Sequence, residues 1–426
     1  MSIGMSDELN SFKQRALIKV CGVGGAGGNA IARMIEEGLD DVEFIAINTD
    51  AQALQRSPAG CRLQIGSEFT GGLGSGAKPE IGLKAALEDR ERISDVVTGA
   101  DMVFITCGLG GGTGTGAAPI VAEIARGSGA LTVGIATLPF SFEGKERMDN
   151  ALNGLQELEE RVDTLIVVPN DRVAQICQDN MSLLQAFRQA DEVLHNGVRA
   201  ISDLITVPGL INLDFADVRT IMQSRGRALM GIGTAEGENR AVRAAEEAIV
   251  CPLLEQSNID GAMGVIANVT AGCDVGMREV QDAVATVQEA AHPEANIIFG
   301  AVVDDEERPE IQVTVIAAGF QRGVTREFLS ASGATAELVD LHATREKMAE
   351  RAEQPSGEAL PAAASAGGSV PPGGSGPEEG LSLRGAGQVE YLFPPDGSEI
   401  ASQPVRSEPD EDLGIPAFMR RRKRKQ

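Results

Sequence analysis

The sequence predicts an α/β protein with a Rossmann-like parallel sheet, a long central helix, a second and smaller α/β domain, and a disordered C-terminal tail. Short apolar runs alternate with amphipathic helical patterns over the first 180 residues, as is typical of parallel sheets. A long amphipathic stretch follows at about 180–205. After about residue 345 the composition turns to Gly, Ala, Pro and Ser, which cannot bury enough apolar surface to fold.

Five apolar runs in the first part predict buried strands, at 16–23, 42–48, 101–108, 131–138 and 163–169. Helical patterns lie between them at about 28–38, 80–97, 116–127 and 143–161. Because parallel strands need crossover connections, these elements predict one parallel sheet with right-handed crossovers.

The central helix is predicted from apolar residues that recur on one helical face: Leu183, Leu184, Phe187, Ala190, Leu194, Val198 and Ile201. Pro208 and Gly209 end it. A second α/β unit then has strands at 226–233, 262–270, 296–303 and 310–320, with helices near 239–249 and 275–288. Only DDEERP separates the last two strands, so we expect them to be neighbours in the sheet.

Charge and composition argue against several classes of protein. Lys and Arg number 37 against 62 Asp and Glu, and a net charge of −25 argues against nucleic-acid binding by the body of the chain. The six cysteines and three histidines are widely spaced, so neither a disulfide framework nor a zinc site is expected. With no signal-peptide pattern and no run of 18 apolar residues, we expect a cytoplasmic protein.

Two glycine-rich loops carry the strongest functional signal. Residues 22–29 (GVGGAGGN) follow the first predicted strand, and residues 108–116 (GLGGGTGTG) follow the strand at 101–108. Glycines at the start of a helix let backbone N–H groups approach a phosphate, and the helix dipole favours the anion. The Thr113 and Thr115 hydroxyls add donors to the second loop. The pattern G-x-x-x-x-G-K-[ST] is absent, so the loops are not a P-loop.

A third glycine-rich loop, 71–77, has two interpretations. It can close over a terminal phosphate, or it can be a mobile surface loop.

These segments together resemble the family formed by the tubulins and FtsZ, the tubulin-like GTPase of bacterial cell division. GGGTGTGAAP (110–119) is similar to the signature loop of that family. Further matching segments occur in the family's order: GVGGAGGNA, NTDAQAL, GLGSGAKPEIG, PFSFEGKERM, PND, NLDFADVRT and IPAFMRRR. The resemblance covers about 15–320 and the last dozen residues, and the terminal peptide is similar to the bacterial branch.

The resemblance implies binding of GTP and GDP. The residues implied to form that site are Gly24, Gly25, Ala26, Gly28, Asn29, Asn48, Ala77, Gly108, Gly110, Gly111, Gly112, Thr113, Gly114, Thr115, Pro139, Glu143, Arg147, Asn170, Phe187 and Asp191. In the family pattern Glu143 and Arg147 hold ribose and phosphate, and Asn170 contacts the sugar and base.

Phe187 and Asp191 match the family's guanine-recognition positions. They are four residues apart and share a helical face. A carboxylate can accept from guanine N1–H and N2–H together, a pair that adenine lacks. The alternatives are a core aromatic for Phe187 and a solvated charge for Asp191.

Asn212, Asp214 and Asp217 are implied to be catalytic. In the family this segment inserts into the nucleotide site of the next subunit of a head-to-tail filament, where the aspartates position the attacking water, with Mg²⁺ or K⁺ as the cation. The alternative is structural, because Asp214 is also a plausible N-cap of a helix.

The predicted domains are a flexible N-terminus (1–14), a GTP-binding domain (15–179), the central helix (180–205), a C-terminal activation domain (206–322), a mostly disordered linker (323–411) and a partner-binding peptide with a basic end (412–426). Within that peptide the family pattern assigns Ile415, Pro416, Phe418, Met419 and Arg420 to membrane-tethering division adaptor proteins. The resemblance places such a protein in a mid-cell ring beneath the inner membrane. The run Arg420 to Lys425 either adds affinity for anionic lipid or only solubilises the end.

Two rival functions are weighed against this one. An NAD-dependent oxidoreductase would use the first glycine loop and Asp50, but it needs only one such loop. A nucleotide-gated scaffold that does not hydrolyse the nucleotide would not need Asp214 and Asp217.

The chain also departs from the family pattern at three positions: Ser75, where Ala is common, and Cys21 and Cys107, which are either thiol-sensitive or simply small buried residues.

Overall fold

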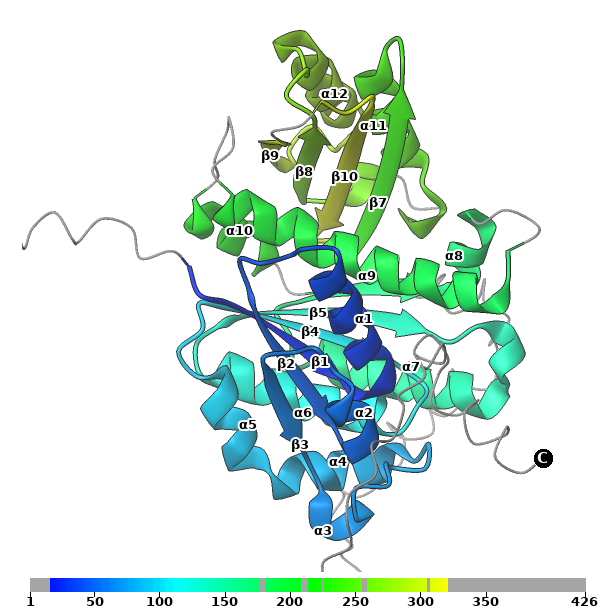
Figure 1. Ribbon diagram of the computed structural model, residues 1–426. Helices are drawn as coiled ribbons and strands as arrows, with labels where there is room; N and C mark the ends of the chain where they lie inside the picture. The colour runs from blue at the N-terminus through cyan, green and yellow to red at the C-terminus, as the bar shows by residue number, and fades with distance from the viewer. Residues whose placement is uncertain are drawn as a thin grey trace, which may run out of the picture. The chain divides into compact units, whose positions relative to one another are not determined.

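The computed structural model describes residues 16–176, 181–207, 214–223, 226–254, 259–304 and 307–320, and all of them belong to one compact unit (Figure 1). The predictions for 1–14, Asn212, 323–411 and 412–426 lie outside the described residues.

One ten-stranded sheet runs through the described part of the chain, in the order β3-β2-β1-β4-β5-β6-β7-β10-β8-β9. Its strands are β1 (Ile18–Val23), β2 (Glu43–Asn48), β3 (Cys61–Gln64), β4 (Met102–Gly108), β5 (Leu131–Leu138), β6 (Thr164–Pro169), β7 (Gly226–Glu236), β8 (Gly264–Ala271), β9 (Asn296–Val303) and β10 (Glu310–Ala318). Pairing is parallel from β3 to β7, and β10 is antiparallel to both of its neighbours. The predicted parallel sheet is therefore confirmed.

Two strand predictions need correction. β3 was not predicted, because CRLQ is only four residues long and places Arg62 between its apolar positions. The expected pairing of β9 with β10 is wrong, since β8 lies between them. β10 is almost wholly buried and needs a strand on each side, whereas β9 is the partly exposed edge strand that runs parallel to β8.

The helices are α1 (Gly24–Glu36), α2 (Ala51–Gln55), α3 (Ser67–Thr70), α4 (Pro79–Glu88), α5 (Arg90–Val97), α6 (Thr113–Gly127), α7 (Lys145–Glu159), α8 (Asn170–Ile176), α9 (Leu183–Thr206), α10 (Phe215–Met222), α11 (Arg240–Val250) and α12 (Met277–Ala290), with short 3₁₀ turns at Ser141–Glu143, Pro252–Leu254 and Ile259–Gly261. The predicted helix at 80–97 is two helices. Asp89 separates them, and its Oδ2 accepts from Gly66 N at 2.7 Å.

Two helices begin earlier than predicted, α1 at Gly24 and α6 at Thr113. Glycine disfavours helix, so the sequence suggests that these residues form loops. In the structure the glycines instead form the first helical turns. Some of them pack closely there, since a Cβ on Gly27 would clash with Thr106 O of β4 and one on Gly116 would clash with Pro79 O of α4.

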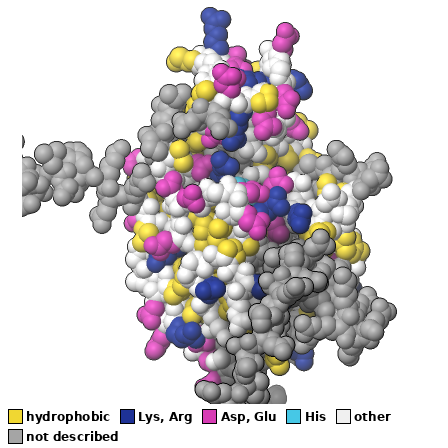
Figure 2. Space-filling model, viewed as in Figure 1, with side chains coloured by type: hydrophobic (Ala, Val, Ile, Leu, Met, Phe, Trp, Pro, Cys, Tyr) yellow, Lys and Arg dark blue, Asp and Glu magenta, His cyan; other side chains and the backbone are white. Residues whose placement is uncertain are grey.

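The central helix α9 joins the two halves of the sheet (Figure 1). Ser182 and Gln185 cap its start reciprocally. Its buried face contacts β5 and β6 and also β8 and β9, and Asn268 Nδ2 donates to Ala200 O at 3.4 Å. On the face shown in Figure 2, acidic and basic side chains gather where α9 meets α1, and there Arg33 pairs with Glu37 at 2.7 Å and with Glu192 at 3.7 Å.

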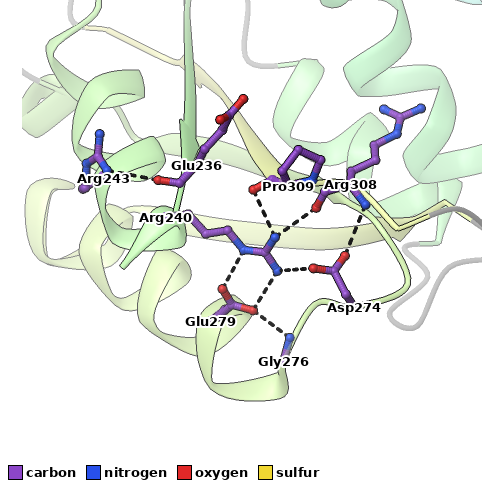
Figure 3. Close-up of polar contacts among 8 residues, drawn as sticks. All are labelled: Glu236, Arg240, Arg243, Asp274, Gly276, Glu279, Arg308 and Pro309. Atoms are coloured by element: carbon purple, nitrogen blue, oxygen red, sulfur yellow. Dashed lines mark hydrogen bonds and ion pairs between the residues drawn. The ribbon is translucent and has the colours of Figure 1, made fainter. Parts of the chain in front are cut away.

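The buried side chain of Arg240 connects several elements of the second half of the fold through hydrogen bonds (Figure 3). From the start of α11 it donates to Glu279 Oε1 and Asp274 Oδ2, both at 2.8 Å, and to the carbonyls of Arg308 and Pro309 at 3.0 and 3.2 Å. Its guanidinium therefore ties α11 to α12 and to the β9–β10 connection, a planar fork that lysine cannot reproduce.

The connections reverse direction at β1. The chain passes from β1 outward to β2 and β3, and then returns to β4 on the other side of β1. In open parallel sheets such a reversal leaves a crevice at the carboxyl ends of the two strands, where ligands bind. Both glycine loops follow these strands.

Candidate functional site

Two helix N-termini meet at the crevice. α1 has 13 residues and α6 has 15, and each begins in a glycine loop with no acidic residue in its first turn. The unsatisfied N–H groups and the positive end of each helix dipole are therefore available for an anion.

The glycines of the two loops serve two physical purposes. Some allow the loops to touch: a Cβ on Gly24, whose φ is +78°, would lie 2.7 Å from Gly114 N, and one on Gly108 would lie 2.6 Å from Ala26 Cβ. Others face open space, because a Cβ on Gly25 or Gly111 would meet no atom within 4 Å. Tight packing alone does not explain the second group, so these glycines leave room for a ligand.

A cavity of about 350 Å³ lies between the loops, and a second one of about 270 Å³ adjoins it. The first is lined by sixteen of the twenty predicted nucleotide residues: Gly25, Ala26, Asn29, Asn48, Ala77, Gly108, Gly111, Gly112, Thr113, Gly114, Pro139, Glu143, Arg147, Asn170, Phe187 and Asp191. Gly24 and Gly28 line the second cavity, which shares Gly25, Asn29, Asn48, Ala53 and Asp191 with the first. The structure thus brings residues from seven segments of the chain together at one cavity.

Gly110 and Thr115 line neither cavity. Gly110 has φ +90° and supports Arg147, whose carbonyl would lie 2.6 Å from a Cβ there. Thr115 is buried against Gly154 of α7. The sequence motif includes both residues in the phosphate loop. In the structure Gly110 packs against Arg147, and Thr115 packs against Gly154.

The structure adds lining residues that the sequence did not single out, among them Leu73 and Thr137. Thr137 is the penultimate residue of β5. Its position at the carboxyl end of a parallel strand could have predicted from the sequence that it lines a ligand site. Leu73 is exposed, and apolar residues in loops carry no comparable signal.

Three aromatic rings lie together near the start of α9, and one of them, Phe187, lines the cavity. Phe140 stacks on Phe142 with ring centroids 4.9 Å apart and meets Phe187 edge-on at 5.3 Å. Phe187 is only half-buried and lines the cavity, so the core-aromatic alternative is not borne out. Its ring is positioned to stack on a planar base.

Asp191 lies beside this ring, and burial raises the pKa of its carboxyl to about 7, while the nearby Arg33 partly opposes the shift. Asp191 is partly buried and lines both cavities, which does not favour the solvated-charge alternative. A carboxylate with costly desolvation gains most from a ligand that donates hydrogen bonds to it.

Other polar groups also fit a nucleotide. Asn170 is buried at the cavity wall, and its Oδ1 has no hydrogen-bond partner among the described residues. Such an orphaned acceptor is costly unless a ligand satisfies it. Arg147 Nε pairs with Glu143 Oε2 at 2.9 Å, while Glu143 Oε1 accepts from Phe140 N at 2.8 Å, so the cation is held in place over the cavity.

Asp50 lines the cavity, but its carboxylate is already engaged. Its Oδ1 caps α2 by accepting from Gln52 N at 2.9 Å and Ala53 N at 3.2 Å. The ribose contact that an oxidoreductase would require of Asp50 is therefore poorly supported.

Cys21 and Cys107 are fully buried, and burial raises the pKa of each thiol to about 12. They are small packing residues without thiolate character at neutral pH.

Asp214 and Asp217 do not reach either cavity. Both are exposed, at the start and in the first turn of α10. Among the described residues no group of three His, Cys, Asp or Glu side chains is arranged to hold a metal ion.

Comparison with known proteins agrees with this architecture. Residues 17–178 match the model of the Tubulin/FtsZ family GTPase domain, and residues 226–321 match that of the FtsZ family C-terminal domain. A mutant FtsZ from M. jannaschii is 47% identical, with a TM-score of 0.71 over 74% of this chain and 95% of that one. An empty FtsZ dimer from the same organism is 46% identical, with a TM-score of 0.70 over 74% and 92%. CetZ2 from Haloferax volcanii, 21% identical with a TM-score of 0.61 over 79% and 100%, shares the fold.

The fold and the paired glycine loops thus define a GTPase of the tubulin type, which binds GTP and GDP. Within that class, the chain belongs to the FtsZ family. No helix in the described residues is long and apolar enough to cross a membrane.

The raised pKa of Asp191 predicts a pH-dependent stability difference. The pKa of Asp191 is raised to about 7 in the folded protein, so the carboxyl keeps its proton up to about that pH, whereas the unfolded chain releases it near the ordinary pKa of 3.8. The wild-type free energy of unfolding should therefore fall relative to that of Asp191→Asn as pH rises from 4 to 7, by at most about 1.4 kcal/mol per pH unit, and then level off.

Urea unfolding of both nucleotide-free proteins at pH 5, 6, 7 and 8 measures this difference. The other titrating groups are common to both proteins and cancel. A difference that is the same at all four pH values would contradict the burial of the carboxyl.

Proposed function

We propose that this GTPase polymerises head-to-tail into filaments that organise the bacterial division ring, and that it hydrolyses GTP at a composite site between adjacent subunits. The nucleotide cavity of one subunit supplies the binding loops, and Asp214 and Asp217 of the next, with Asn212, supply the water-positioning groups. The observation that carries the proposal is the separation of these two sets within a single subunit.

The two sets of residues lie at opposite ends of the strand β5. Arg219 of α10 donates from Nη2 to Gly129 O at 3.3 Å, so α10 lies beside the residues that lead into β5 (Figure 1). Pro139, directly after β5, lines the cavity. Eight residues of strand span roughly 26 Å, so the aspartates of a subunit cannot reach its own cavity. A head-to-tail contact brings unlike ends together and generates an open filament.

The capping alternative for Asp214 has little support. Asp214 occupies the N-cap position of α10 with an extended backbone, but its side chain makes no capping hydrogen bond. Both carboxylates are exposed and can act on a neighbouring subunit. In hydrolysis they would orient the attacking water, and Mg²⁺ or K⁺ would neutralise charge on the phosphates.

Base recognition completes the proposal. In this proposal Phe187 stacks on guanine, Asp191 accepts from its N1–H and N2–H, and Asn170 contacts the sugar or base. The position of all three at one cavity supports these roles. The empty FtsZ dimer at 46% identity supports self-association within the family.

Hydrolysis should depend on protein concentration. Since each complete site needs two subunits, we expect phosphate release per subunit to rise above a threshold concentration with GTP and to stay far lower with ATP. A rate per subunit that is independent of concentration would contradict the shared site, and equal rates with ATP would contradict the base assignment.

A mixing experiment tests whether one site draws on two subunits. Asp217→Ala removes a proposed water-positioning carboxylate and leaves the nucleotide cavity unchanged. Gly111→Ala keeps that carboxylate and places a methyl group in open space within the cavity, where it would obstruct the nucleotide. Each variant alone should hydrolyse GTP at least tenfold more slowly than wild type. An equimolar mixture that assembles at random should regain up to about a quarter of the wild-type rate, because about one junction in four then pairs an intact cavity with an intact acid.

The unmixed variants serve as controls, and both should unfold within about 0.5 kcal/mol of wild type because they alter exposed or open positions. A mixture no more active than its components would refute the composite site.

The C-terminal peptide is proposed to recruit the membrane-tethering adaptors through Ile415, Pro416, Phe418, Met419 and Arg420, since a short apolar motif after an acidic tether suits groove binding. Deleting 412–426 should leave GTP hydrolysis intact and abolish adaptor binding in a pull-down with purified adaptors. Retained binding would refute this role.

A further inference from the structure

A groove lies at the amino ends of the first strands, away from the nucleotide site. Its volume is about 530 Å³. The end of α1, the starts of β2 and β3, and the end of α5 supply most of its wall (Figure 1). It shares no lining residue with the cavity between the glycine loops, and only Pro58 with the cavity that adjoins it. The groove is therefore separate from the site described above.

The wall of the groove is mostly apolar. Its apolar side chains include Ile35, Leu39, Val42, Phe44, Cys61 and Val96. All of these except Leu39 are only half-buried, so apolar surface in the groove remains in contact with water. Covering that surface would be favourable, and an apolar groove with a polar border is typical of an interaction site.

Acidic side chains border the groove. Asp40 and Asp95 are exposed there, and neither makes an ion pair among the described residues. The amine of Lys19, which also lines the groove, is already engaged: it donates to two backbone carbonyls at the end of α5, at 2.9 and 3.2 Å, and lies 3.7 Å from Glu43. A basic segment that entered the groove would therefore meet carboxylates that lack a partner.

The N-terminal segment, residues 1–15, joins the described chain close to this groove. Leu17 N donates to Asp101 Oδ2 at 2.8 Å, and Lys19, two residues later, lines the groove. From β1 to β3 the groove crosses two strand spacings, or about 10 Å. Four extended residues before Leu17 span up to about 13 Å, so the segment can reach across the groove without a long connecting loop.

The N-terminal segment lies outside the described residues, but its sequence suits the groove. Met5, Leu9 and Phe12 are spaced by four and three residues, which places them on one face of a helix. Lys13 and Arg15 follow and match the acidic border in charge. A segment with one apolar face and a basic end is thus complementary to an apolar groove with an acidic border.

We propose that the N-terminal segment docks in the groove of its own chain, with Leu9 and Phe12 against the apolar wall and Lys13 and Arg15 near the acidic border. Because the segment is tethered only a few residues from the groove, its effective concentration there is on the order of millimolar, and a modest apolar contact keeps it docked. The inference rests neither on the proposed catalytic site nor on assembly.

The reactivity of Cys61 reports whether the groove is covered. Cys61 is half-buried in the groove, Cys273 is exposed in the second half of the fold, and Cys21 and Cys107 are buried. Modification of each thiol of the full-length protein by N-ethylmaleimide can be followed by mass spectrometry. Phe12→Asp should raise the rate at Cys61 at least about tenfold and leave Cys273 unchanged, because burial of a Phe side chain favours the docked state by about that factor.

The matched control is Gln14→Asp, which adds the same charge on the opposite side of the helical pattern and should change the rate at Cys61 by less than about twofold. Cys21 and Cys107 should stay unmodified in all three proteins, as expected if the fold is intact. Equal rates at Cys61 in the wild type and Phe12→Asp would overturn the proposal in favour of the flexible N-terminus expected from the sequence. A wild-type rate at Cys61 that rises on dilution would also overturn it, because a second copy of the chain would then cover the groove.

Discussion

The close approach of two glycine loops is the constraint on which the rest of the site depends. Gly24 and Gly114 lie so near each other that a single added carbon would meet backbone. Only this approach lets α1 and α6, which follow β1 and β4, direct their N-termini into one cavity. The sheet provides the geometry, since its connections reverse at β1, and the absent side chains let the two backbones meet.

The chemistry of the cavity is divided along its length. The end near α9 has a half-buried ring, an acid whose ionisation is disfavoured, and an unsatisfied amide oxygen. These groups suit a planar base with hydrogen-bond donors. The loops supply backbone N–H groups and hydroxyls, which suit phosphates. A nucleotide satisfies both ends at once, because it carries a base with hydrogen-bond donors at one end and phosphates at the other.

Much of this was predictable from sequence, and the failures have physical causes. Buried parallel strands are continuous apolar runs, so β1, β4 and β5 were found nearly to the residue. The lining residues Asn170, Phe187 and Asp191 came from family resemblance, because no spacing rule marks them. β3 was too short to show a pattern, and the order of β8, β9 and β10 depends on long-range packing that separation along the chain does not report. The hydrogen bonds that join Thr113 Oγ1 to the hydroxyls of Thr49 and Ser75 were equally hidden, since three distant polar residues carry no joint signal.

The central helix has a mechanical consequence. α9 has 24 residues and is therefore about 36 Å long. Its first turns present Phe187 and Asp191 to the cavity, and a later turn accepts a hydrogen bond from Asn268 of β8. A continuous helix is stiff along its axis because every turn is bonded to the next. Because α9 is continuous, a displacement of its first turns would also displace the turns that contact β8 and β9, with no loop between them.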